Sequence, residues 1–188
     1  MSTSNSTSLR GHFLIAMPNL LDPNFYHSVT YICSHDEGGA MGIVINNPLD
    51  VSLKDLLQHL EIEVEGDFTD RALLLGGPVD PERGFVVHRP GGRWDASLKV
   101  SSDVAITTSR DILHAIAQQQ GPDSAFVALG YAGWSAGQLE EEILDNAWLS
   151  VPATAQVLFD TPIEQRWQAA AALIGFDIHQ LSGEAGRA

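Results

Sequence analysis

The residues whose types could do chemistry lie in two segments, one rich in glycine and one rich in arginine. The first is 130–143, in which three glycines within eight residues are followed by three consecutive glutamates. The second is 71–99, where Arg83 and His88 stand at the two ends of an apolar run. Because arginine binds anions and histidine transfers protons near neutral pH, these segments could form an anion-binding site or an acid–base site.

The sequence predicts that the glycine-rich segment is a tight loop between a strand and a helix. Residues 124–129 are an apolar run typical of a buried strand, and 136–145 have the pattern of an acidic helix. Gly130, Gly133 and Gly137 indicate that another group approaches this backbone closely, either a neighbouring strand, which we favour, or a ligand. The glutamates would repel a phosphate, and neither the P-loop lysine nor the dinucleotide-binding spacing is present.

Part of this segment has a structural explanation. Ser135 and Gln138 have the spacing of a capping box, which satisfies backbone N–H groups at the start of a helix. Trp134 and Leu139 have the spacing of a hydrophobic staple. A serine whose hydroxyl is engaged in a cap does not indicate a hydrolase.

We predict a ligand-binding site, whose residues are Arg83, His88, Gly130, Tyr131 and Gly133. Arg83 and His88 are five residues apart, so a straight strand would point them to opposite faces, and both reach one cleft only if the chain bends near Gly84. The structural alternatives are that the arginines form surface ion pairs and that His88 is a core or rim histidine.

No metal ion, cofactor or catalytic residue is predicted. None of the seven histidines has the spacing of a ligand pair. Glu141 and Asp145 lie four residues apart and could offer oxygens to Mg²⁺ or Ca²⁺, but they fill few of the roughly six positions such an ion needs. Cys33, the only cysteine, lies in an apolar run and is expected to be buried rather than reactive.

Length and composition predict a single domain. The chain has 188 residues and 44% hydrophobic content, enough for one core. We expect a disordered N-terminal tail over 1–9, one domain over 10–181 and a frayed C-terminal tail over 182–188. Because no signal peptide precedes the domain and no apolar run approaches the ~20 residues of a membrane span, we expect a cytoplasmic protein without a membrane partner.

The charge is unevenly distributed. The net charge is −14, yet residues 71–99 carry five Lys or Arg against three Asp or Glu, which is +2, while 1–70 and 100–188 carry −8 each. A chain this acidic repels nucleic acid, so direct DNA binding is not expected. The basic segment is instead predicted to hold a small anionic ligand or an acidic protein partner.

The order of predicted elements favours an α+β fold with mixed strand pairing. Strands are predicted at 13–17, 29–33, 41–45, 72–75, 85–87, 97–107, 124–129 and 156–159. The strands 29–33 and 41–45 form a hairpin. Helices are predicted after a Ser52–Asp55 cap, around 112–117, at 136–145, and from Pro162 to about residue 173.

With these residues in place, the chain resembles the AlgH/YqgE family of bacterial cytosolic proteins from about Leu9 to the end. The matching segments, in the family's order, are 13–18, Asn24 with Phe25, 39–46, 76–79, 83–88 and 130–143. One departure is Asn47, where the family pattern usually has arginine. The resemblance implies an α+β fold in which a mixed, bifurcated sheet is curled into a pseudo-barrel with flanking helices.

The resemblance also brings the label of transcriptional regulator, but it establishes no catalytic residue and no cofactor. We therefore expect a non-enzymatic binding or regulatory protein that acts indirectly rather than by direct DNA binding. The alternative is a small-molecule enzyme that uses His88 and Arg83 in a glycine-lined cleft.

Overall fold

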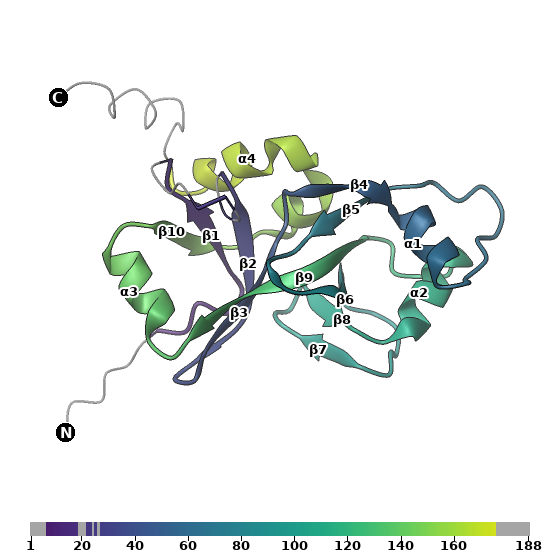
Figure 1. The fold of residues 1–188 in the computed structure, drawn as a ribbon, viewed down its shortest axis with the longest axis horizontal. Helices are drawn as coiled ribbons and strands as arrows, with labels where there is room; N and C mark the ends of the chain where they lie inside the picture. The colour runs from purple at the N-terminus through teal and green to yellow at the C-terminus, as the bar shows by residue number, and fades with distance from the viewer. Residues whose placement is uncertain (1–6, 19–21, 24, 26, 176–188) are drawn as a thin grey trace.

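A computed structural model describes residues 7–18, 22–23, 25 and 27–175, and within them ten strands form one curled sheet (Figure 1). The strands are β1 (His12–Ala16), β2 (Val29–Asp36), β3 (Gly39–Val44), β4 (Pro48–Ser52), β5 (Ala72–Leu75), β6 (Val79–His88), β7 (Ser97–Lys99), β8 (Ala105–Thr107), β9 (Ala125–Ser135) and β10 (Trp148–Pro152). Their order is β10-β1-β2-β3-β9-β6-β8-β7. β4 pairs with β5, and β5 joins β9 in parallel.

The sheet forks along β9, which runs through the middle of the molecule (Figure 1). One edge of β9 pairs with β6, and the other pairs first with β5 and then with β3. The backbones crowd where these strands separate. A Cβ atom on Gly130 would lie 2.5 Å from the carbonyl oxygen of Gly77, so only glycine fits there. The predicted close approach at Gly130 is therefore made by neighbouring backbone.

The prediction of a loop at 130–134 is wrong, because these residues continue β9 as far as Ser135. Their side chains alternate, and Ala132 and Trp134 are buried in a small apolar cluster with Leu139. The glycines were misleading because glycine marks turns and close strand contacts alike. Ala132 and Trp134 thereby hold the second half of β9 in the sheet.

The helix after β9 is present, but its cap differs from the prediction. α3 (Gln138–Leu144) begins after Gly137, whose φ of 76° is left-handed, and a Cβ atom there would meet nothing within 4 Å. Conformation, not close approach, explains Gly137. The Ser135 N–H and hydroxyl both donate to Gln138 Oε1, at 3.0 and 3.2 Å. Only the half of the capping box made by Gln138 is formed.

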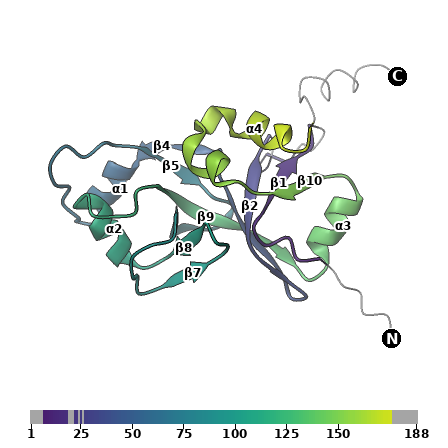
Figure 2. The ribbon, with the colours of Figure 1, turned by 180° about the vertical axis from the view of Figure 1, so that it is seen from behind.

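The other helices cover the two ends of the sheet. α1 (Leu53–His59) starts at Ser52 with the predicted capping box complete, and it lies beside α2 (Arg110–Ala117) (Figure 2). Both bury apolar faces in one cluster with Val86 and Val127. α4 (Arg166–Ala172) packs against β1 and β2 over the main core. None of the helices in the described ranges is long and apolar enough to cross a membrane.

Several other predictions need correction. Gln156–Asp160 is a π-helical turn rather than a strand. The prediction failed because an apolar run this short fits either a strand or a helix. The Val157 N–H donates to Thr154 Oγ1 at 3.3 Å, as in a helical turn. The predicted strand 97–107 divides into β7 and β8. β4 and β10 were not predicted. The tail 182–188 and Asn24 lie outside the described residues, as does all of 1–9 except residues 7–9.

Candidate ligand-binding site

A pocket of about 530 Å³ lies inside the curl of the sheet, between the β2–β3 hairpin and the β7–β8 hairpin. Its walls are mainly apolar, and they include Met41, Phe85, Leu98, Ile106 and Tyr131. Arg83, Ser97 and Thr108 add polar groups to the lining. The volume and the mixture of an apolar body with a few polar groups are those of a site for a small organic molecule.

Arg83 lies at this pocket over the ring of Phe85. Its guanidinium carbon lies 5.3 Å from the centroid of the Phe85 ring, and the Phe85 and Tyr131 rings meet edge to face at 5.8 Å. Arg83 is exposed, and it makes no ion pair with any residue in the described part of the chain. A guanidinium that is held over an apolar pocket without a carboxylate partner is suited to binding an anion.

The predicted site residues come together only in part. Arg83 and Tyr131 line the same pocket. Gly133 pairs with Met41, another lining residue, and so lies beside the pocket. Gly130 is at the fork of the sheet, where its neighbours are the backbones of Gly77 and of the start of β6. Gly130 shapes the framework and is not among the lining residues.

His88 does not line the pocket. The prediction that His88 and Arg83 reach one cleft is therefore wrong. Along β6, Phe85 and Val87 face the main core, whereas Val86 faces the cluster under α1 and α2. His88 follows the alternation of Val86 and therefore points to the opposite face of the sheet from Arg83. The irregular pairing of β6 with β9 lies between Val79 and Gly84, before this run, and does not bring the two side chains together.

Both ring nitrogens of His88 are engaged. Nδ1 lies 2.8 Å from the carbonyl oxygen of Arg89, so it carries the proton and donates. Nε2, at 2.7 Å from Thr107 Oγ1, then accepts from that hydroxyl. The residue is 1% exposed, and burial lowers the pKa of His88 below its ordinary value, with the hydrogen bond to Arg89 opposing the shift. His88 is a neutral structural histidine that ties β6 to β8.

Cys33 is buried, as predicted, in the wall of the pocket. Burial raises the pKa of the thiol far above its ordinary value, and the nearby positive charge of Arg10 opposes this shift only weakly. Because the thiolate is the reactive form, Cys33 is a poor nucleophile.

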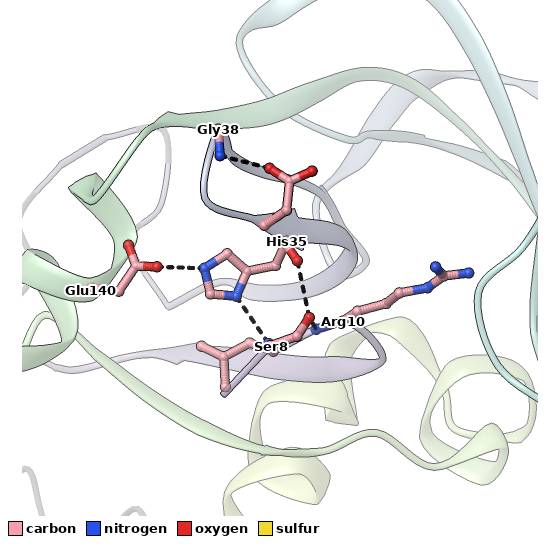
Figure 3. A network of polar contacts seen from close by, with 7 residues as sticks. Ser8, Arg10, His35, Gly38 and Glu140 are labelled. Atoms are coloured by element: carbon pink, nitrogen blue, oxygen red, sulfur yellow. Dashed lines mark hydrogen bonds and ion pairs between the residues drawn. The ribbon is translucent and has the colours of Figure 1, made fainter. Parts of the chain in front are cut away.

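A polar network that sequence reasoning missed anchors the N-terminal segment beside the pocket (Figure 3). His35 Nδ1 accepts from the Leu9 N–H at 2.9 Å, and Nε2 donates to Glu140 Oε1 at 2.7 Å. The Ser8 hydroxyl donates to the carbonyl oxygen of His35 at 3.0 Å. His35 is therefore in its Nε2–H form and joins three segments that are far apart in the sequence. No spacing in the sequence signals such a link.

Arg10 extends from this anchored segment to the other side of the pocket. Its Nε donates to the carbonyl oxygen of Val100 at 3.1 Å, and Nη2 donates to that of Lys99. Arg10 therefore connects the segment held by β2 to the end of β7. This bridge fixes one boundary of the opening between the two hairpins.

The three glutamates after Gly137 have separate surroundings. Glu140 is the partner of His35, and its own backbone N–H, followed by the His35 hydrogen bond, lowers the pKa of its carboxyl group. Glu142 Oε2 accepts from the indole N–H groups of Trp134 and Trp148, at 2.7 and 3.0 Å. Glu141 is exposed. Within the described ranges, no three His, Cys, Asp or Glu side chains are grouped so that they could hold a metal ion.

Comparisons with known proteins agree with this architecture. The AlgH-like family model matches residues 13–179. A UPF0301 protein of Thioalkalivibrio sulfidiphilus is 57% identical over 183 residues, which covers 97% of this chain and 98% of that protein. A UPF0301 protein of Saccharophagus degradans is 55% identical over 181 residues, covering 96% of this chain and 89% of that protein.

Solved structures extend the likeness to three dimensions. The solution structure of the AlgH protein from Pseudomonas aeruginosa is 45% identical, covers 100% of both chains and superimposes with a TM-score of 0.78. A crystal structure of a Corynebacterium diphtheriae protein has the same fold at 20% identity, with a TM-score of 0.72 over 92% of this chain and 90% of that one. The chain belongs to the AlgH-like family.

Proposed function

We propose that this chain is a binding protein whose pocket takes an organic anion with an apolar body, or an acidic segment of a protein partner that presents the same chemistry. The observation that carries the proposal is the exposed Arg83 guanidinium, which lies over an apolar pocket of about 530 Å³ without an ion-pair partner in the described residues. The anionic group would pair with Arg83, and the apolar body would contact Phe85, Leu98 and Tyr131.

Two observations support binding rather than catalysis. His88, the residue best suited to acid–base work, points away from the pocket and has both ring nitrogens engaged. Cys33 lies in the pocket wall, but burial keeps it as a thiol. An enzyme that uses His88 and Arg83 together is accordingly the weaker hypothesis.

Any regulatory effect would follow indirectly from this binding. With a net charge of −14, the chain has only the short segment 71–99 with which to meet phosphates. A protein that responds to an anionic ligand or an acidic partner needs no contact with DNA to change the activity of other proteins. The regulator label of the family fits this indirect role.

The direct test is a thermal-shift titration with octanoate and 3-phenylpropionate, and with inorganic sulfate as a comparison. The two carboxylates are expected to stabilise the protein more than sulfate does, because sulfate offers charge but no apolar body. Ligand at a hundred times its dissociation constant adds about 2.7 kcal/mol. Arg83→Gln should lose the stabilisation while its unliganded melting temperature stays close to that of the wild type.

Arg93→Gln is the matched control, because Arg93 is an exposed arginine of the same basic segment that is not among the lining residues. This variant should respond to the carboxylates as the wild type does. Equal stabilisation of wild type and Arg83→Gln would exclude Arg83 as the anion-binding group.

A further inference from the structure

β7 is the last strand in the order of the sheet, and of the described strands only β8 pairs with it. All three residues of β7 are exposed, and Leu98 is 47% exposed although it lines the pocket. Because Ser97 and Leu98 line the pocket, the unpaired edge of β7 lies beside it.

The register shows which backbone groups lie on this unpaired edge. The Thr108 N–H donates to the Ala96 carbonyl oxygen, and the Val100 N–H donates to the Val104 carbonyl oxygen, both at 2.9 Å. Hydrogen-bonded positions alternate along an antiparallel pair, so residues 96, 98 and 100 bond to β8. The N–H and C=O groups of Ser97 and Lys99 consequently point away from β8.

Arg10 agrees with this register and limits the free edge. Its Nη2 donates to the Lys99 carbonyl oxygen, which must therefore face away from β8. The outward groups that remain are the N–H and C=O of Ser97 and the N–H of Lys99. They form a short template of two donors and one acceptor beside the pocket, where an extended chain could pair.

We infer that the occupant of the site is an extended, acidic segment of a protein partner, which adds to β7 as a further strand. This inference rests on the proposed binding function and deepens it. Pairing with Ser97 and Lys99 would place the segment beside the pocket. Because every second side chain of a strand lies on the same face, one apolar side chain would enter the pocket beside Leu98, and an acidic side chain two residues away would be available to Arg83.

Charge and geometry both favour this partner. Residues 71–99, which include Arg83 and β7, carry +2 in a chain whose net charge is −14. An acidic segment is attracted here and repelled by the rest of the molecule. A small organic anion could use Arg83 and the apolar walls but would leave the outward backbone groups of Ser97 and Lys99 without a pairing partner.

The test selects peptides from a phage-displayed library of random 12-residue sequences on the wild-type protein. The enriched peptides are expected to carry an acidic residue two positions away from an apolar one. Synthetic versions are then titrated by fluorescence anisotropy against wild type, Ser97→Pro and Ser97→Ala. Proline removes the outward N–H and leaves the pairing with β8 intact, as is usual on edge strands. Alanine keeps this N–H but, like proline, lacks the serine hydroxyl.

We expect Ser97→Pro to weaken peptide binding about tenfold, because it removes one backbone hydrogen bond and obstructs the edge, and Ser97→Ala to bind within twofold of wild type. Arg83→Gln should also weaken binding. Amide hydrogen exchange on the wild-type protein, measured by NMR, gives an independent readout that needs no variant. The bound peptide should slow exchange at Ser97 and Lys99 and leave the amides that already bond to β8 unchanged.

The strand inference is overturned if no peptide is enriched, if the enriched peptides bind Ser97→Pro as tightly as wild type, or if the Ser97 and Lys99 amides exchange at the same rate with peptide bound. If octanoate still stabilises the wild type through Arg83 in that case, the binding function stands and the occupant is a small organic anion. If neither peptide nor carboxylate binds, both proposals fail.

Discussion

Arg83 and His88 differ in role although both belong to β6. Arg83 stands on the face that carries the pocket, where Phe85 supports its guanidinium. His88 stands on the other face, where it accepts from Thr107 and donates to the Arg89 carbonyl. The alternation of side chains along a strand separates them. His88 therefore stabilises the fold, although histidine is a residue type suited to acid–base chemistry. Of the two residues, Arg83 is the one that is available to a ligand.

At this scale we predict that His88 makes stability depend on pH. Burial lowers the pKa of His88 in the folded protein below its ordinary value of 6.5, so the unfolded chain binds more protons in acid. The contribution of His88 is fully present above about pH 6.5 and falls as the pH drops towards the lowered folded-state value. Urea denaturation at pH 7.5 and pH 5.5 should show a smaller difference in unfolding free energy for His88→Gln than for wild type.

His114→Gln serves as the control, since His114 is an exposed histidine on α2. It should keep the pH dependence of the wild type. If His88→Gln and wild type lose equal stability between the two pH values, His88 is not the group responsible.

Among the elements, β9 decides the architecture. It joins the two parts of the sheet because one of its edges pairs with β5 and then with β3. Gly130 lies at that change of partner and has a φ of 78°, a left-handed value that glycine adopts readily. Gly137 has nearly the same φ, 76°, but lies in open space before α3. Comparing these two glycines therefore separates the energetic effect of a left-handed backbone conformation from that of close approach by another strand.

We predict that alanine at Gly130 destabilises the protein much more than alanine at Gly137. Gly137→Ala should cost about 1 kcal/mol for the left-handed conformation alone. Gly130→Ala adds a Cβ atom 2.5 Å from the carbonyl oxygen of Gly77, a backbone atom in the middle of the sheet that cannot move freely. The two effects together should cost about 3 kcal/mol or more.

Urea denaturation followed by tryptophan fluorescence would measure both variants. Equal unfolding free energies for Gly130→Ala and Gly137→Ala would mean that the sheet adjusts at the fork and that close approach does not explain Gly130.

For the whole molecule, the distribution of charge sets which partners are possible. The basic segment 71–99 includes Arg83 and β7, while the rest of the chain carries −16. Two of the four arginines of this segment already have partners within the protein. Arg71 donates to the Ala125 carbonyl oxygen at 2.8 Å, and Arg89 lies 3.5 Å from Asp160. The segment suits a local acidic group rather than a run of phosphates.

We therefore predict no useful affinity for duplex DNA. Binding DNA requires several lysine or arginine side chains that converge on phosphates, and the net charge of −14 opposes it. A fluorescence anisotropy titration at about 150 mM salt should give a dissociation constant weaker than the micromolar range. Sub-micromolar binding with a steep salt dependence would restore a direct role as a DNA-binding regulator.

The sequence by itself determined the features that depend on local patterns. The 29–45 hairpin, the capped start of α1 at Ser52 and the burial of Cys33 were all confirmed. Each of these rests on residues close together in the chain, where turn chemistry, capping and hydrophobic runs act directly. The mixed, curled sheet and its α+β class were also confirmed, but they came from the family resemblance as well as from the order of elements.

Only the tertiary structure decided which residues meet. Gly130 looked like a loop residue because its close neighbour, Gly77, is far away in the sequence. Arg83 could be assigned to a pocket only once β6, β7 and β9 had been placed around it, and Arg10 and His35 gave no local sign of their links to β7 and α3. The curl of the sheet and the register of its strands arise from long-range pairing, which local sequence patterns do not encode.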